Sequence, residues 1–270
     1  MGEIFNTLII HPILNVLVAI YHVLQLAHIP YSLGFSIIIL TILIRLLISP
    51  LVASQLRASK KMQTIAPHLA NLKEKHKGDS KRLQEETMRL YREHGVNPVA
   101  GCLPVLIQLP IIWGLYGVLS NVVKMHDSAL VNYINGIVIS PIKLTSAWDA
   151  SFFGLQLGES PSTLIKTIGV LAILVPVITG IFQFIQSKML IAPSSSSTGQ
   201  KKNDDFATAF QAQSVYIFPA MIAFFSYGFP LGLSLYWNTF TVFGIIQQYK
   251  IQGLGGLEQT WQTIKTKLKK

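Results

Sequence analysis

The sequence predicts an all-α membrane protein with five transmembrane helices, an N-terminal interfacial helix and a cytoplasmic helical hairpin. Of its 270 residues, 50% are hydrophobic and only 13% are charged, and the mean hydropathy is +0.46. This composition is typical of proteins that cross a membrane several times. The apolar residues form uninterrupted stretches that reach the roughly 20 residues a helix needs to span the hydrocarbon core.

Residues 1–28 are predicted to form an amphipathic helix that lies in the membrane interface. Its polar side chains fall near one helical face, opposite Leu, Ile and Phe residues, and we expect that face to meet the lipid headgroups. These polar residues are His11, Asn15, His22 and Gln25. A sixth transmembrane helix is the alternative. No carboxylate accompanies the histidines, so we expect no metal site here.

Residues 29–53 contain the first predicted transmembrane helix, and its only charge is Arg45. An arginine inside such a helix is rare and indicates a functional role. Two interpretations remain open. At a rise of about 1.5 Å per residue, Arg45 lies about 9 Å from Leu51, so its side chain can extend to the nearer interface. Alternatively, Arg45 faces the interior of the helix bundle in a wet, polar cavity.

Residues 54–97 form a polar, strongly charged segment with two helical patterns, and they predict a helical hairpin outside the membrane. Gly78 and Asp79 form the turn between the two helices. Pro67 is expected to kink the first helix, and Gly95 is expected to end the second as a C-cap.

The rest of the chain completes the predicted architecture. Its segments are a second transmembrane helix (98–123), an extracytoplasmic loop (124–166), a third transmembrane helix (167–187), a flexible cytoplasmic loop (188–205), the fourth and fifth transmembrane helices (206–249) and a basic cytoplasmic tail (250–270). Residues 227–232, with two glycines and a proline, are the break between the last two helices.

The distribution of lysine and arginine predicts the orientation of the helices. Ten of these residues lie in the 54–97 hairpin, three in the 188–205 loop and five in the tail, whereas the 124–166 loop holds three. Because cytoplasmic segments carry the excess of positive charge, we expect the N-terminus outside and the C-terminus in the cytoplasm. Arg45 then lies toward the cytoplasmic half of the membrane.

The sequence lacks the motifs of an intramembrane enzyme. It contains neither HExxH nor GxSxG, and all seven histidines lie outside the predicted spans. We therefore expect no enzyme activity, no cofactor and no metal. Repeated halves and intramembrane acids, which are typical of solute transporters, are also missing. A solute transporter and an assembly scaffold for membrane proteins remain possible functions of the chain.

The predicted spans combine one arginine with neutral polar side chains. These are Thr41, Gln108, Gln183, Gln186, Trp237 and Asn238. Any one of them is explained by a hydrogen bond to a neighbouring helix. An arginine and several amides without an acidic partner, however, suggest a hydrated positive site that receives a transient negative guest.

Three long and specific stretches of the sequence resemble a known family. They are TILIRLLISPL at 41–51, GVNPVAGCLPVLIQLPI at 95–111 and FPLGLSLYWNTFTVFGIIQQ at 229–248. They resemble the YidC/Oxa/Alb membrane protein insertases over nearly the whole chain. The resemblance implies an insertase and folding chaperone of the bacterial plasma (inner) membrane. The large extracytoplasmic domain of some bacterial members has no room here, so the chain resembles the minimal five-span form.

The resemblance also implies where the site lies. In this family five spans enclose a hydrophilic groove that opens to the cytoplasm and to lipid. The first-span arginine of that groove corresponds to Arg45, and its polar residues from the third and fifth spans correspond to Gln186 and Trp237. Gln183 is the alternative for the third-span position, and Gln108 matches the family's IQxP motif. No cofactor or nucleotide is implied.

The partners implied by the resemblance are nascent membrane proteins and the lipid bilayer. The ribosome, the Sec translocon and the signal recognition particle machinery are further candidates. The 54–97 hairpin is expected to receive the substrate, with a merely solvated charged face as the alternative. The lysines of the tail are expected to meet either ribosomal RNA phosphates or anionic headgroups.

Overall fold

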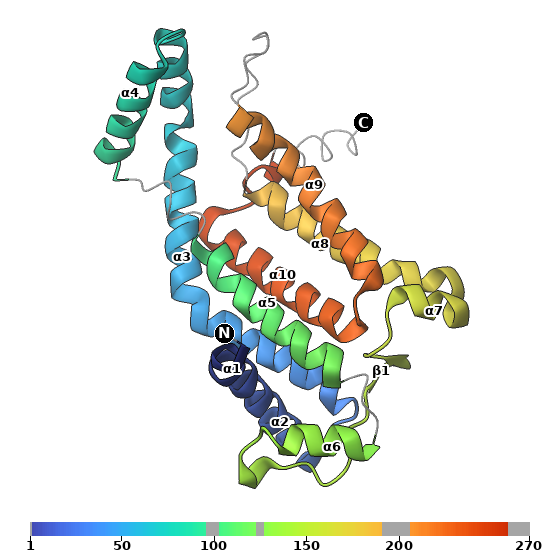
Figure 1. Cartoon of the computed structure of the whole chain (residues 1–270). Helices are drawn as coiled ribbons and strands as arrows, with labels where there is room; N and C mark the ends of the chain where they lie inside the picture. Colours follow the sequence, from blue (N-terminus) through green and yellow to red (C-terminus); the bar gives the residue numbers. More distant parts are fainter. Residues whose placement is uncertain (1, 96–102, 123–126, 191–205, 259–270) are drawn as a thin grey trace. The chain divides into compact units, whose positions relative to one another are not determined.

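The computed structural model describes residues 2–95, 103–122, 127–190 and 206–258. It is almost entirely helical (Figure 1), as the sequence predicts. The helices are α1 (Gly2–Phe5), the π-helix η1 (Asn6–Ile10), α2 (His11–Leu26), α3 (Ser32–Lys75), α4 (Ser80–Glu93), α5 (Leu103–Val122), α6 (Asp127–Asn135), η3 (Ser140–Ile142), α7 (Pro161–Ile168), η4 (Gly169–Ile173), α8 (Leu174–Met189), α9 (Phe206–Gly228) and α10 (Leu231–Gln252). Strands β1 (Ser151–Phe152) and β2 (Leu155–Gln156) form an antiparallel hairpin.

Three helical stretches of the described residues are long and apolar enough to cross a membrane. They are Glu3–Leu26, Ser32–Leu72 and Pro161–Met189, and the shorter stretches Leu109–Leu119 and Val215–Gly228 are also apolar. The two longer ones after the N-terminal helix contain the first and third predicted spans. The number of five spans stays a prediction, as does the choice between an interfacial and a spanning N-terminal helix. Parts of the predicted second span, of the 188–205 loop and of the tail lie outside the described residues.

The chain forms two compact units, which are described separately. Unit 1 comprises Met1–Leu47, Ile107–Phe184 and Asp205–Phe243, and unit 2 comprises Ile48–Leu106, Ile185–Asp204 and Gly244–Lys270. Unit 1 has an apolar core to which α2, α3, α5, α6 and α10 contribute buried side chains. Among them are Leu14, Leu17, Ile37, Leu40, Leu115, Leu119, Ile134 and Tyr236.

Two residues of the polar face of α2 form hydrogen bonds with the loop after α6, and contact of this face with headgroups stays a prediction. Asn15 Oδ1 accepts a hydrogen bond from Ile139 N at 3.0 Å, and a ring nitrogen of His22 lies 2.9 Å from Ile142 O. The loop after α6 leaves these backbone groups without partners of its own, and the two side chains of α2 satisfy them.

Unit 2 contains the predicted hairpin segment. Helix α3 continues without interruption through Pro50 and Pro67 to Lys75, so the first span and the first hairpin helix are one helix. Asp79 caps α4 by accepting a hydrogen bond from Arg82 N at 3.0 Å. Gly95 follows α4 with φ +59°, in the left-handed conformation expected of a C-cap.

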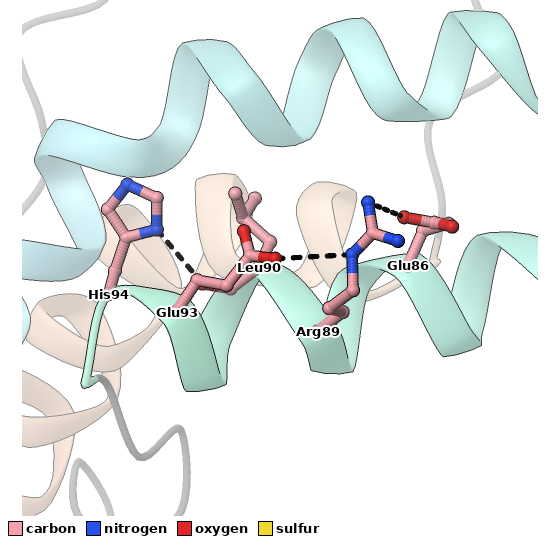
Figure 2. A network of polar contacts seen from close by, with 5 residues as sticks. All are labelled: Glu86, Arg89, Leu90, Glu93 and His94. Carbon is pink, nitrogen blue, oxygen red and sulfur yellow. Dashed lines mark hydrogen bonds and ion pairs between the residues drawn. The ribbon is translucent and has the colours of Figure 1, made fainter.

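The second helix of this segment, α4, carries an exposed ion-pair network (Figure 2). Arg89 contacts Glu86 at 2.8 Å and Glu93 at 3.3 Å, one turn away on either side. The rings of His68 on α3 and His94 after α4 lie 6.2 Å apart. Within unit 2, α4 therefore folds back beside the end of α3.

Candidate functional site

Arg45 is buried within unit 1, with an exposed fraction of 3%. Its Nε and Nη2 atoms donate hydrogen bonds to the backbone oxygen of Phe240 on α10, at 3.0 and 2.6 Å. Of the two interpretations left open by the sequence, the structure matches the one in which Arg45 faces the interior. Among the described residues, no carboxylate forms an ion pair with it.

Phe240 contacts the guanidinium a second time through its side chain. Arg45 Cζ lies 3.3 Å from the centroid of the Phe240 ring, so the ring covers one face of the cation in a cation–π contact. A helix carbonyl has two lone pairs and accepts these hydrogen bonds in addition to the helical one. A guanidinium has five N–H groups in a fixed fork. The backbone oxygen of Phe240 binds only the edge formed by Nε and Nη2.

Gln183 on α8 and Trp237 on α10 meet in the same unit. Trp237 Nε1 donates to Gln183 Oε1 at 3.1 Å, and Gln183 is 7% exposed. Trp237 precedes Phe240 by one helical turn. The structure thus brings two of the predicted residues into direct contact and places a third, Arg45, against the next turn of α10.

A chain of buried hydroxyl groups extends this polar region toward α9. Ser226 Oγ donates to Thr179 Oγ1 at 3.4 Å and lies 3.1 Å from Ser234 Oγ. All three residues are at most 2% exposed. Asn238 Oδ1 and Thr241 Oγ1 on α10 are also buried, and neither has a hydrogen-bond partner among the described residues. Buried polar atoms without a partner are costly, and a water molecule or a polar ligand would satisfy both.

The roles of the other two predicted site residues, Gln186 and Gln108, stay predictions. Gln186 belongs to unit 2. It is half-buried, and no hydrogen bond of its side chain to a described residue is present. The side chain of Gln108 lies outside the described part of α5.

Sequence reasoning missed Phe240, the most important partner of Arg45. An apolar residue in a predicted span gives no signal of such a role, because the contact uses its backbone oxygen and its ring. Thr179, Ser226, Ser234 and Thr241 were also missed. Small hydroxyl residues are common in membrane helices, so only the packing of α8, α9 and α10 identifies them.

The arrangement favours binding over chemical catalysis. Within the described ranges, no group of three His, Cys, Asp or Glu residues lies close enough to hold a metal ion. The polar groups are a cation, amides and hydroxyls that lie along helices. They can stabilise a polar or anionic segment of another molecule.

Comparisons with known proteins agree with the family resemblance. The family described as "60Kd inner membrane protein" matches residues 25–255. The membrane protein insertase MisCA of Bacillus subtilis (strain 168) is 36% identical over 224 residues, which cover 82% of this chain and 70% of the relative. The membrane protein insertase YidC of Fusobacterium nucleatum subsp. nucleatum is 35% identical over 222 residues, covering 82% and 87%.

More distant comparisons extend the similarity to plastids and to a solved structure. The chloroplast inner membrane protein ALBINO3 of Arabidopsis thaliana is 31% identical over 237 residues, which cover 86% of this chain and 49% of the relative. A crystal structure of an active YidC insertase, with its first transmembrane domain resolved, is 26% identical with a TM-score of 0.54. The match covers 86% of this chain and 44% of that one. The names of the bacterial relatives describe insertases and not enzymes, in agreement with the sequence expectation.

Proposed function

The chain belongs to the family of 60Kd inner membrane proteins, and from this premise we propose that it is a membrane protein insertase and folding chaperone. It inserts transmembrane segments of newly made proteins into the bacterial plasma membrane. The observation that carries the mechanism is Arg45, a buried cation whose partner is a neutral carbonyl. Such a cation keeps its charge and one side of its fork for a transient anion.

The ligand of Arg45 is the acidic tail of the substrate. Guanidinium and carboxylate groups form two parallel hydrogen bonds, and such bonds are about twice as strong as those between neutral groups. Among the described residues, the hydrogen bonds of the guanidinium all go to Phe240 O, and its remaining N–H groups are the proposed partners of the tail. A tail with one or more carboxylates therefore binds better than a neutral tail.

The energy of this contact has the right magnitude for a transient intermediate. A carboxylate at the bilayer centre is disfavoured by about 3 kcal/mol on insertion scales. Two unit charges about 4 Å apart attract each other by about 4 kcal/mol at an effective dielectric constant of 20. The two values nearly cancel, so the tail enters the membrane and is still able to leave. The apolar segment that follows moves into lipid because burial of apolar surface is favourable.

The finer arrangement follows the family pattern. Five transmembrane helices, with the N-terminus outside and the C-terminus in the cytoplasm, enclose a hydrated groove. Gln183 and Trp237 line that groove together with Arg45, supported by their direct contact, and Gln186 and Gln108 are further candidates. Nascent membrane proteins and the bilayer are the principal partners. The ribosome, the Sec translocon and the signal recognition particle machinery are proposed as additional ones.

Insertion into proteoliposomes that contain only this protein tests the proposal. The substrates are a single-span protein with an acidic tail and its matched variant with a neutral tail, and the readout is protection of the tail from protease. We expect Arg45→Gln to lower insertion of the acidic tail at least about tenfold. A hydrogen bond to a charged group contributes about 1.5–3 kcal/mol, and 1.4 kcal/mol is a factor of ten. Insertion of the neutral tail should change little.

Three outcomes separate the parts of the proposal. Equal loss for both tails would contradict the role of Arg45 as a charge partner. No change for either tail would retain the insertase and remove Arg45 from its mechanism. No protection by the folded native protein, above that of empty liposomes, would overturn an autonomous insertase.

A further inference from the structure

The β-hairpin of unit 1 has an apolar residue, Phe153, at its tip, where the backbone conformation disfavours it and most of its surface is exposed. Strands β1 and β2 are joined by Phe153 and Gly154, with φ +49° and +82°. A two-residue turn with both φ values positive favours Asn-Gly or Gly-Gly. A phenylalanine in the left-handed region is strained, yet Phe153 remains 68% exposed.

The Phe153 ring lies in an aromatic cluster at the beginning of α3. Its centroid is 4.9 Å from that of Tyr31 and 4.8 Å from that of Phe152. Phe35, in the first turn of α3, lies 5.5 Å from Phe152 and 6.5 Å from Phe153. The tip of the hairpin is therefore level with the first turn of this helix.

That level coincides with the end of a membrane span. The stretch Ser32–Leu72 contains a candidate span, and its apolar part begins directly after Tyr31. Aromatic side chains concentrate where spans meet the headgroups. A second aromatic group lies at the turn between α9 and α10, where the ring of Phe229 is 5.9 Å from that of Tyr116 and 6.0 Å from that of Phe225.

The hairpin is held rigidly to both helix ends. A side chain at Gly34 would overlap the ring of Phe152, so the hairpin approaches the α3 backbone as closely as glycine permits. Leu231 N and Gly232 N, at the start of α10, each donate a hydrogen bond at 2.8 Å, to Glu159 O and Leu157 O respectively. The hairpin itself, residues 150–158, contains no charged residue.

We propose that this hairpin is a membrane-interface anchor: Phe153 inserts between lipids at the headgroup–acyl boundary, beside Tyr31. Contact with lipid buries a ring that the protein leaves exposed and offsets the strain of its backbone. The rigid attachment then holds the beginnings of α3 and α10, the two helices that contribute Arg45 and Phe240, at a fixed depth in the bilayer. The inference is independent of the proposed function.

Spin labels on the full chain in liposomes test the anchor. The only native cysteine is Cys102, so Cys102→Ser provides a background for labels at Phe153→Cys and at the control Gln156→Cys, an exposed residue of β2. We expect the label at 153 to collide several-fold more with oxygen, relative to a water-soluble nickel chelate, than the label at 156. Equal access of the nickel chelate to both labels would overturn the proposal. Spin–spin broadening at 153 would also overturn it, since it would identify a second copy as the occupant.

A photoreactive phenylalanine analogue at 153 provides a second measurement that retains an aromatic ring at the turn. We expect adducts with lipid at 153 and none at 156, detected by mass spectrometry. Adducts only with water, or only with another protein chain, would overturn the proposal even if the cysteine variants failed to fold.

Discussion

Two arginines of this chain have opposite environments. Arg45, in unit 1, is 3% exposed and binds a backbone oxygen and an aromatic ring. The side chain of Arg89, in unit 2, is 67% exposed and contacts two carboxylates of its own helix (Figure 2). The residue with the greater need for a counter-charge is the one that has none among the described residues.

The comparison shows what an acidic partner would do at each place. Exposed ion pairs contribute about 0–1 kcal/mol, so the network of Arg89 affects little beyond α4. A carboxylate beside Arg45 would occupy the guanidinium permanently in a medium where the attraction is strong. The neutral partner Phe240 stabilises the side chain, and in the proposed mechanism the charge of Arg45 then pairs with the substrate.

The largest effect on insertion is expected from giving Arg45 a carboxylate partner on its own helix, like the partners of Arg89. Thr41 is fully buried, one turn before Arg45, and donates to its own helix at Ile37 O. An aspartate four residues before an arginine forms a favourable pair. We expect Thr41→Asp to lower insertion of acidic tails about tenfold, like Arg45→Gln, because bonds to charged groups contribute about 1.5–3 kcal/mol. Protease protection of the tail measures the change.

Thr41→Asn is the matched control for this substitution. It has the same shape without the charge and should insert acidic tails within about twofold of the native protein, since neutral hydrogen bonds contribute about 1 kcal/mol or less. If Thr41→Asp inserted acidic tails normally while correctly folded, the absence of a carboxylate at Arg45 would have no functional meaning.

A smaller effect is expected from the ring of Phe240. In Phe240→Leu the backbone oxygen still binds Arg45, but the cation–π contact, worth about 1–2 kcal/mol when desolvated, is lost. The guanidinium is then held less firmly toward the substrate. We expect the ratio of acidic-tail to neutral-tail insertion to fall several-fold, with the neutral tail unaffected.

Phe240→Tyr retains the ring and should restore the ratio. Phe243→Leu is the control on the same helix and should leave the ratio unchanged. A ratio that is equal in Phe240→Leu and the native protein would limit the role of Phe240 to its backbone oxygen.

The sequence predicts the helices and the family well because both depend on long patterns. The family is confirmed by matches over most of the chain, and the predicted hairpin turn lies between the end of α3 at Lys75 and the start of α4 at Ser80. Gly95 takes the left-handed conformation, which only a few residue types adopt easily. Local chemistry determines the turn and the C-cap, whereas the family match depends on most of the chain.

Contacts between helices depend on rotation and packing, which a single sequence does not specify. Gln183 and Gln186 are three residues apart and share a helix face, so spacing alone did not choose between them for contact with Trp237; the structure pairs Gln183 with it. The sequence could not identify Phe240 as the partner of Arg45, because the contact uses a backbone oxygen, which every residue has. The binding of Asn15 and His22 to the loop after α6 was missed because the path of a loop is not periodic.

The smallest effect, a change in the free energy of unfolding, is expected for the ion pairs of Arg89, the exposed arginine of the comparison. Removing one carboxylate of its network by Glu93→Gln should change the free energy of unfolding by less than about 0.5 kcal/mol, the range of exposed pairs one helical turn apart. The change should vanish in high salt, because exposed charges are screened. A double-mutant cycle with Arg89→Gln, measured by thermal unfolding of the whole chain at low and high salt, isolates the pair.

A coupling energy between Arg89 and Glu93 well above about 1 kcal/mol, or one insensitive to salt, would show that the network stabilises α4 as a structural unit. Arg89 would then be an arginine that stabilises the fold, and its ion pairs would no longer serve as the weak, exposed counterpart of Arg45.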